Sequence, residues 1–280
     1  MIIVIGADGL LGHQFCRLLG PEAIGLNRRQ LDITDSGRSE RILRKLKLSV
    51  IINCAGYTAV DKAEEDRGKC FAVNCDGVKN LAAVAARLDA ILVQISTDYV
   101  FGDHNESAGP IPETSPASPR GVYATSKWEG EKYAANWPRH LIIRTCGLYG
   151  SAPKGDHFVG TVLRLAKQRE VLRIVHDQRC NPTSTAALAE AVTRLLSLNQ
   201  LGTFHVVSSP PMSWLEFAEE ILRQANLEAP IVPITTAQYS ARAPRPRYSV
   251  LDTTKYTQLT GQPIPSISQS LGQYLSERGE

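Results

Sequence analysis

The sequence predicts an α/β fold with a doubly wound parallel sheet, followed by a smaller C-terminal α/β domain. Short runs of β-branched and other apolar residues alternate with helical patterns through the first half of the chain. Parallel strands buried on both faces produce such continuous apolar runs, and helical crossovers connect them. The chain has 280 residues, 43% of them hydrophobic, which suffices for a sizeable core in one or two domains.

The N-terminal half contains the regular part of this alternation. We predict strands at residues 2–5, 23–26, 50–53, 91–96 and 141–145, and helices at residues 11–19, 39–46, 63–88 and 126–136. Right-handed crossovers would place these helices on both faces of the sheet. Four prolines between Gly102 and Gly121 predict a long ordered loop.

After residue 150 the alternation becomes irregular. We predict helices at 158–167 and 186–198 and strands at 172–175 and 203–207, and the pair Ser213 and Glu216 forms a capping box that opens a further amphipathic helix. The first domain should cover residues 1–150, with segments from about 184–207 returning to it. Residues 151–280 should mainly form the second domain.

Composition excludes several classes of function. Thirty-one Lys and Arg residues against 28 Asp and Glu residues give a net charge of +3, too small to predict nucleic acid or an anionic membrane as a partner. No apolar run reaches the roughly 20 residues that span a bilayer, and the first one stops at Gly6. Six cysteines without a Cys-x-x-Cys pair indicate reduced thiols in a cytoplasmic protein. The histidines lack metal-ligand spacing, so we predict no metal site on that basis.

A glycine-rich motif follows the first strand directly and opens a helix. In this context Gly6 permits a tight turn, Gly9 lets the backbone approach a pyrophosphate, and Gly12 lets the helix pack on the strand. The Gly-x-x-Gly-x-x-Gly spacing resembles that of extended short-chain dehydrogenases. We therefore expect a Rossmann-like dinucleotide-binding domain at residues 1–150, with its first cofactor contacts at Gly6, Asp8, Gly9, Leu10, Leu11 and Gly12.

The end of the second strand carries the cofactor preference. An NAD site would place a carboxylate there, whereas this chain has Asn27, Arg28 and Arg29. Two guanidiniums suit a 2′-phosphate, so we expect NADPH to be preferred, with NADH still possible and solvated surface arginines as the alternative. Further cofactor contacts are expected at Asp32 and Ile33 beside the adenine, and at Cys54, Ala55, Gly56 and Tyr57 beside the ribose and pyrophosphate.

Two segments carry reaction chemistry. Tyr123 and Lys127 stand four residues apart on one face of a helix start. A nearby ammonium favours phenolate, so we expect Lys127 to lower the pKa of Tyr123 and to contact the nicotinamide ribose. Tyr123 could then donate a proton to the carbonyl oxygen of a substrate. Thr97 lies at the carboxyl end of a predicted buried strand, where open α/β sheets bind ligands, and its hydroxyl can donate a hydrogen bond to that same oxygen.

Together these motifs resemble the dTDP-4-dehydrorhamnose reductase family over nearly the whole chain. The resemblance rests on the glycine motif, residues 57–64, 71–74, 96–101, 123–127, 177–178, 182–183, 204–205, 213–218 and 245–252. It implies a catalytic triad of Thr97, Tyr123 and Lys127, and reduction of the C4 ketone of dTDP-4-dehydro-L-rhamnose. Asn74 matches the position that supports the catalytic lysine in related dehydrogenases. Residues 151–280 would then be mainly substrate-binding. Substrate contacts are expected at Thr97, Asp98, Tyr99, Val100, His157 and Arg245, the last toward the diphosphate.

The chain departs from the family pattern at several places. Gly147 stands where the family often has tryptophan, and His157 and Cys180 replace a usual asparagine and glycine. Gln14 replaces an acidic residue that helps to hold Mg²⁺ at a dimer contact in some members, so a Mg²⁺ site is doubtful and the chain is expected to be a monomer or a homodimer. Two alternatives stay open: a reductase or epimerase of another nucleotide sugar, and a non-catalytic regulatory subunit that binds dinucleotide.

Overall fold

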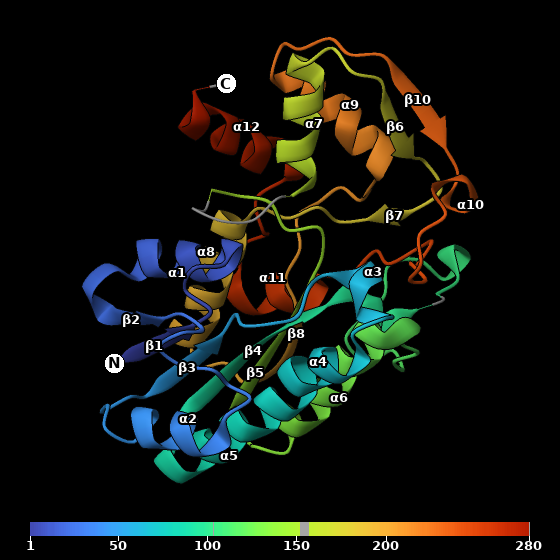
Figure 1. The fold of residues 1–280 in the computed structure, drawn as a ribbon. Coiled ribbons are helices and arrows are strands. Elements are labelled where there is room, and N and C mark those ends of the chain that lie inside the picture. Colours follow the sequence, from blue (N-terminus) through green and yellow to red (C-terminus); the bar gives the residue numbers. More distant parts are fainter. Residues whose placement is uncertain (103, 152–156, 280) are drawn as a thin grey trace.

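The computed structural model describes residues 1–102, 104–151 and 157–279 (Figure 1). Its strands are β1 (Ile2–Ile5), β2 (Ala23–Leu26), β3 (Val50–Asn53), β4 (Ile91–Thr97), β5 (His140–Thr145), β6 (Leu172–Val175), β7 (Arg179–Cys180), β8 (Gly202–His205), β9 (Met212–Ser213) and β10 (Ile231–Ile234). Its α-helices are α1 (Leu10–Leu19), α2 (Ser36–Leu43), α3 (Val60–Ala63), α4 (Arg67–Phe71), α5 (Gly77–Leu88), α6 (Gly121–Ala135), α7 (Phe158–Lys167), α8 (Thr185–Ser197), α9 (Trp214–Gln224), α10 (Thr236–Tyr239), α11 (Thr254–Thr260) and α12 (Ile267–Arg278).

The central sheet has six parallel strands in the order β2-β1-β3-β4-β5-β8. Because β2 and β3 lie on opposite sides of β1, the winding reverses there, which is where open α/β sheets form a ligand crevice. The register pairs Ile5 with both Leu26 and Asn53. The loops that follow these three strands therefore leave the sheet at the same edge.

Helices cover both faces of this sheet, as the doubly wound prediction requires (Figure 1). On one face, α1, α8 and α11 pack on alternate strand residues such as Val4, Val93 and Phe204. On the other face, α2, α5 and α6 pack on the intervening residues, including Ile51 and Leu92. Burial of both faces explains why the strands are apolar throughout.

The chain returns to the first lobe after entering the second. Strand β8 pairs with β5, α8 packs on α1, and α11 packs on β8. Between these segments, β6 pairs in parallel with β10, and β7 pairs antiparallel with β9. Helices α7, α9 and α12 share a separate core around Phe217, Ile221 and Leu271. The C-terminal lobe is thus smaller and mixed in topology.

Helix boundaries differ from the sequence prediction where tertiary or capping contacts intervene. Helix α2 begins three residues earlier than predicted, because the Asp35 side chain caps it by accepting from the Arg38 N–H. The predicted helix at 63–88 is divided into α3, α4 and α5, with a π-helical stretch, Ala72–Asp76, before α5.

The proline-rich loop before α6 is packed against both lobes. Ile111 exchanges backbone hydrogen bonds with Val250 and Asp252, and the Glu113 carboxylate accepts from the His205 N–H at 2.9 Å. Residue 103 of this loop lies outside the described residues. The described remainder is anchored, in line with the prediction of an ordered loop.

Candidate active site

A crevice of about 380 Å³ lies at the carboxyl ends of β1, β2 and β3. Tyr57 stands at its end nearest the reaction chemistry described below. The residues predicted for the cofactor that line the crevice are Gly6, Asp8, Gly9, Asn27, Arg28, Asp32, Ile33, Cys54, Ala55, Gly56 and Tyr57. Of the other residues predicted to contact the cofactor, Leu10, Leu11, Gly12 and Arg29 lie in the adjoining segments but outside the lining. Tyr123 and Lys127, also predicted as cofactor contacts, lie on α6 and outside this lining.

The glycine loop forms a cradle that side chains would fill. Gly6 has φ +82°, and a Cβ at Gly12 would lie 2.2 Å from the Gly6 carbonyl oxygen. Gly9 is the N-cap of α1, and as a glycine it has no side chain to accept from the N–H groups of that helix end. Free N–H groups at a helix N-terminus bind phosphate oxygens. The residues present therefore fit a dinucleotide pyrophosphate.

Arg28 and Asp32 face each other at the ribose end of the crevice. The Arg28 Nε lies 3.2 Å from an oxygen of Asp32, and the Arg28 side chain is 81% exposed. Burial pushes the pKa of Asp32 up, but hydrogen bonds from Thr34 and Arg28 outweigh it and hold the pKa below its usual value. Asp32 is thus an anion that competes with any phosphate for Arg28.

Asn74 joins the cofactor loop to the helix that carries Tyr123. Its side-chain oxygen accepts from the Tyr57 N–H at 2.8 Å, and its Nδ2 donates to the Tyr57 carbonyl and to the Ser126 hydroxyl, both at 3.0 Å. A Cβ at Gly130 would lie 2.1 Å from the Asn74 carbonyl oxygen, so α6 approaches this segment closely. The role of Asn74 seen here is to fix the loop at Tyr57 against α6.

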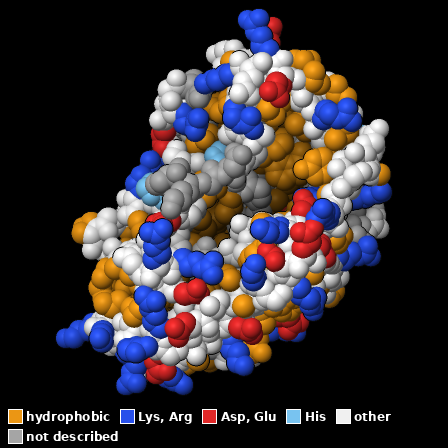
Figure 2. Space-filling model, in the orientation of Figure 1, with side chains coloured by type: hydrophobic (Ala, Val, Ile, Leu, Met, Phe, Trp, Pro, Cys, Tyr) orange, Lys and Arg blue, Asp and Glu red, His pale blue; other side chains and the backbone are white. Residues whose placement is uncertain are grey.

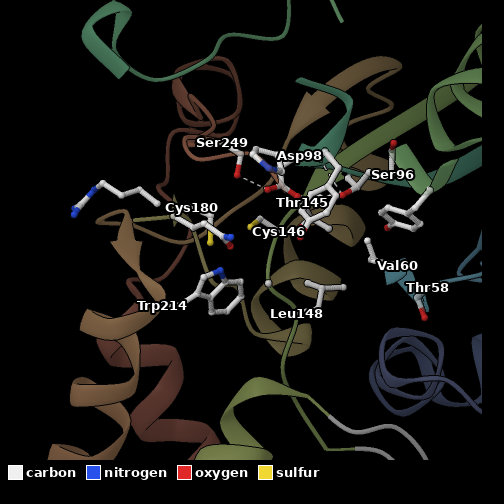
Figure 3. A pocket seen from close by; sticks show the side chains of 17 residues that line it. Thr58, Val60, Ser96, Asp98, Thr145, Cys146, Leu148, Cys180, Trp214 and Ser249 are labelled. Atoms are coloured by element: carbon white, nitrogen blue, oxygen red, sulfur yellow. Dashed lines mark hydrogen bonds between the residues drawn. The ribbon is translucent and has the colours of Figure 1, made fainter. Parts of the chain in front are cut away.

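A second cavity, of about 320 Å³, lies beside the crevice and contains the predicted reaction chemistry (Figure 3). We call it the reaction cavity. Thr97, Asp98 and Tyr99 enter it from the end of β4, and Tyr123 enters it from the first turn of α6. The other lining residues are Thr58, Val60, Ser96, Thr145, Cys146, Gly147, Leu148, Gln178, Arg179, Cys180, Trp214, Pro246 and Ser249. Consecutive residues Tyr57 and Thr58 thus line the crevice and the reaction cavity respectively.

Helix α6 begins five residues earlier than predicted, and a tertiary contact explains the start. Gly121 has φ +78°, and the Glu64 carboxylate, from the segment after α3, accepts from the Val122 N–H at 2.8 Å. This contact satisfies one of the unpaired N–H groups of the helix end. Tyr123 consequently lies within the helix, one turn before Lys127.

The pKa shifts of Tyr123 and Lys127 differ from the expectation that Lys127 lowers the pKa of Tyr123. Burial raises the pKa of Tyr123, with a smaller opposing effect from hydrogen bonding to Thr97. Burial also lowers the pKa of Lys127 to about 8, and its ammonium donates to the Ile95 carbonyl at 2.5 Å. In this geometry Lys127 does not offset the burial of the phenol, because its charge is directed to a backbone oxygen instead.

Three of the residues expected to contact substrate lie outside the reaction cavity: Val100, His157 and Arg245. Val100 is fully buried in an apolar cluster with Phe101, because η3 (Asp98–Phe101) turns it away from the strand end. His157 is the N-cap of α7, where its Nδ1 accepts from the Gly160 N–H at 3.3 Å, and its ring packs on Tyr274. Helix capping therefore accounts for His157, and core packing for Val100.

Arg245 is held by a carboxylate of the first lobe. Its two terminal nitrogens donate to the two oxygens of Asp61 at 3.0 and 2.7 Å, and Asp61 also accepts from the Ala243 N–H. The hydrogen bond from Arg245 is the main cause that lowers the pKa of Asp61. The expected diphosphate contact is thus occupied by an ion pair between the lobes.

A smaller cavity, of about 160 Å³, adjoins the reaction cavity and shares Tyr99, Gln178 and Trp214 with it. Its remaining lining residues are Phe158, Arg173, Ile174, Val175, Tyr239 and Arg245. Figure 2 shows a hollow between the two lobes with hydrophobic side chains on its walls and charged ones nearby. We call this smaller cavity the aromatic cavity.

Local sequence patterns do not predict which residues the second lobe contributes to these cavities. Trp214 follows the capping residue Ser213, so its position on α9 was predictable, but its place between the two cavities was not. Gly147 has φ +53°, and a Cβ there would approach Trp214 to 3.2 Å. The Trp214 ring, from a distant segment, therefore lies against Gly147, the position at which the family often has tryptophan.

The described residues contain neither a cluster of metal ligands nor a membrane-spanning helix. Within residues 1–102, 104–151 and 157–279, no three His, Cys, Asp or Glu side chains come together as metal ligands. Over the same ranges, none of the helices combines the length and apolar character needed to cross a bilayer.

Comparison with known proteins identifies the family. The model of the family described as RmlD substrate binding domain matches residues 1–279. A dTDP-4-dehydrorhamnose reductase of Aggregatibacter actinomycetemcomitans is 36% identical, with 93% of each chain covered. The chain belongs to the dTDP-4-dehydrorhamnose reductase family.

Two further similar proteins extend the similarity to nearly the full length of the chain. The spore coat polysaccharide biosynthesis protein SpsK of Bacillus subtilis is 36% identical over 99% of this chain and 97% of its own. The crystal structure of dTDP-4-dehydrorhamnose reductase from Bacillus anthracis in complex with NADP superposes with a TM-score of 0.94 at 34% identity, covering 99% of this chain and 98% of that one. The family resemblance predicted from the motifs is confirmed.

Proposed function

We propose that this protein is a dTDP-4-dehydrorhamnose reductase, which uses NADPH to reduce the C4 ketone of dTDP-4-dehydro-L-rhamnose. One observation carries the proposal: Thr97 and Tyr123 line a single cavity beside the crevice that the predicted cofactor residues line. A family member of known structure holds NADP. The free state of all six cysteines supports a reducing compartment, and we propose the cytoplasm.

When bound in the crevice, the reduced nicotinamide would supply a hydride, which is one hydrogen together with the two electrons of the reduction. Tyr123 then delivers its phenol proton to the carbonyl oxygen, and the Thr97 hydroxyl donates a hydrogen bond to the same oxygen. Lys127 lies one turn after Tyr123 on α6 and is 8% exposed. Because its ammonium donates to the Ile95 carbonyl and does not offset the burial of the phenol, we assign it the contact with the nicotinamide ribose. Asn74 keeps the loop at Tyr57 in place between the crevice and the reaction cavity.

The two adjoining cavities suit the two halves of a nucleotide sugar. We place the sugar in the reaction cavity and the nucleoside diphosphate in the aromatic cavity, where Phe158 and Trp214 have ring centroids 4.8 Å apart. Aromatic walls favour a flat base. Arg173, exposed on β6, lines the same cavity and offers a guanidinium for the diphosphate.

The preference for NADPH rests on the ribose end of the crevice. Arg28 lines the crevice with an 81% exposed side chain and has one hydrogen-bonded anion, Asp32, beside it. A 2′-phosphate carries more charge than a single carboxylate and offers three acceptor oxygens, so it competes well for the guanidinium.

The deciding experiment measures NADPH oxidation with dTDP-4-dehydro-L-rhamnose that is generated enzymatically in the same cuvette. We expect turnover by the wild type and a loss of kcat of about 10²- to 10⁴-fold in Tyr123→Phe, since a positioned proton donor contributes that much. Tyr133→Phe, on the same helix but outside both cavities, is the matched control and should keep wild-type activity.

Other outcomes would replace the proposal. Absence of turnover together with NAD retained through purification would indicate an epimerase, because an epimerase recycles its own hydride. Absence of turnover with a stoichiometric partner protein would indicate a regulatory subunit. Turnover that is unchanged in Tyr123→Phe would remove Tyr123 as the proton donor.

A further inference from the structure

Asp98 is a buried carboxyl group that the reaction as described above does not use. It lies directly after Thr97, is 2% exposed, and lines the reaction cavity (Figure 3). The Thr97 hydroxyl lies 3.0 Å from its Oδ1, and the Ser249 hydroxyl donates to its Oδ2. The Cys146 side chain also hydrogen-bonds it. Both carboxyl oxygens are therefore held in fixed directions.

Ser249 brings this contact from the other lobe on a well-supported segment. Its N–H donates to the Arg179 carbonyl at 3.0 Å, and the Arg179 N–H donates to the Arg247 carbonyl at 2.8 Å. Two residues on, the Leu251 N–H donates to the Asn181 side chain at 3.0 Å. The position of Asp98 thus depends on the packing of the C-terminal lobe against the end of β4.

The direction of the Thr97 hydroxyl decides whether Thr97 can act on a substrate. Its oxygen accepts from the Tyr99 N–H at 3.2 Å, and it has one hydrogen to donate. If that hydrogen goes to an ionised Asp98, none is left for a carbonyl oxygen. If Asp98 carries a proton on Oδ1, the same 3.0 Å contact runs in the opposite direction and the Thr97 hydrogen is released toward the cavity.

The surroundings of Asp98 favour the neutral acid. In the described part of the chain, Asp98 has no salt bridge, and the groups that act on it are hydroxyls, a thiol and backbone. Burial raises its pKa, although the hydrogen bonds from Ser249, Cys146 and Thr97 oppose this effect. The titratable groups that face it are the phenols of Tyr99 and Tyr123 and the Cys146 thiol, none of them a cation.

A charged Asp98 would also oppose the reaction. Its negative charge raises the pKa of Tyr123 and so weakens the phenol as a proton donor. It would repel the negative charge that develops on the carbonyl oxygen and on the phenolate. A neutral Asp98 removes both effects without adding a new group to the cavity.

We infer that Asp98 is a positioning residue that works as a neutral carboxylic acid: Ser249 holds its Oδ2, and its Oδ1–H donates to Thr97 and turns the Thr97 hydroxyl toward the substrate carbonyl. This inference rests on the proposed function for the identity of the carbonyl. Asp98 keeps its proton throughout, because the proton that reaches the product comes from Tyr123.

The first test does not require activity. Infrared difference spectra of the wild type against Asp98→Asn at neutral pH should contain the carbonyl-stretch band of a protonated carboxylic acid, shifted in D₂O. Asp177→Asn is the matched control, since Thr236 donates to the Asp177 carboxylate and the pKa of Asp177 is lowered. The absolute spectrum of Asp177→Asn should therefore still contain the band, and the wild type minus Asp177→Asn difference should lack it. A wild-type spectrum without the band overturns the inference, whatever the enzyme reduces.

The second test uses turnover. Asp98→Asn can present an N–H to Thr97 in the place of the acid, so its kcat should exceed that of Asp98→Ala and should be less sensitive to rising pH than the wild-type kcat. Asp98→Ala removes the donor and should lower kcat by about tenfold or more with KM little changed, the size of one hydrogen bond. Equal losses in folded Asp98→Asn and Asp98→Ala would overturn the inference. If Asp98→Ala does not fold, the infrared band and Asp98→Asn decide.

Discussion

Arg144 on β5 and Glu131 on α6 form a buried ion pair, and we expect Arg144→Met to destabilise the protein strongly. The Arg144 Nη2 and Nε donate to the Glu131 carboxylate at 2.8 to 3.2 Å, and the two side chains are 6% and 2% exposed. Methionine keeps much of the volume that packs against Phe101 and Trp128. The variant therefore removes the Arg144 charge, and within the described residues the hydrogen bond from Ser96 is the one that Glu131 keeps.

Removal of one partner from a buried ion pair costs about 3–5 kcal/mol, because an uncompensated charge stays in the interior. An unfolding entropy of about 2.1 cal/mol/K per residue over 280 residues gives about 0.6 kcal/mol/K for the chain. The melting temperature of Arg144→Met should thus fall by about 5–8 °C. Circular dichroism during heating, at fixed protein and NADPH concentrations, measures it.

The matched control is Arg139→Met at the start of the same strand region. Arg139 pairs with Asp89 at 2.5 Å, but the side chains are 40% and 74% exposed, so the loss should stay below about 1 kcal/mol. The double variant Arg144→Met/Glu131→Met removes both charges and should be more stable than the sum of the single losses predicts. Equal melting temperatures for Arg144→Met and Arg139→Met would refute the reasoning.

Three further predictions concern the cofactor and the catalytic lysine. Arg28→Ala should lower kcat/KM for NADPH by about 10- to 100-fold, the size of a charge-assisted hydrogen bond, and leave NADH turnover unchanged; equal effects on both cofactors would contradict a 2′-phosphate contact. Gly12→Ala places a Cβ 2.2 Å from the Gly6 carbonyl and should abolish NADPH binding in a fluorescence titration, whereas Gly37→Ala, with 3.8 Å to its nearest neighbour, should not. With the pKa of Lys127 at about 8, kcat/KM should fall as pH rises through that value, and Lys127→Met should lack this limb.

The same shift of Lys127 affects stability with a definite sign. Its pKa is lowered in the folded state from 10.5 to about 8, so the unfolded chain binds more protons between these values. The destabilising contribution is complete below the folded pKa and is relieved as pH rises toward the unfolded pKa. As pH rises over that range, Lys127 should therefore destabilise the folded protein less and less, while activity declines.

Much of the first lobe could be predicted from local patterns. Three of the strands, β1, β2 and β3, begin and end at the predicted residues, because continuous apolar runs bounded by turn residues mark strands that are buried on both faces. The glycine motif also predicted the turn between β1 and α1, since this prediction depends only on the strand before the motif and the helix after it. Eleven of the predicted cofactor residues line one crevice for that reason.

The substrate side could not be predicted in the same way. Val100 matched a family motif and His157 replaces the family's usual asparagine, but core packing and helix capping determine their positions. Arg245 was expected to meet a phosphate, and the structure pairs it with Asp61, 184 residues away. Such pairings depend on how the two lobes meet, which no local pattern encodes.

By itself, the sequence determined the fold class, the cofactor loop and the Tyr123–Lys127 pair, because each depends on spacing within one or two consecutive elements. The tertiary structure alone decided the start of α6 at the Glu64 contact, 58 residues away, and the contact of Ser249 with Asp98, 151 residues away. A hydrogen bond between distant residues requires the folded backbone to bring donor and acceptor within about 3 Å. The motifs therefore predict which functional groups the site contains, whereas packing determines the directions of their hydrogen bonds and their charge states.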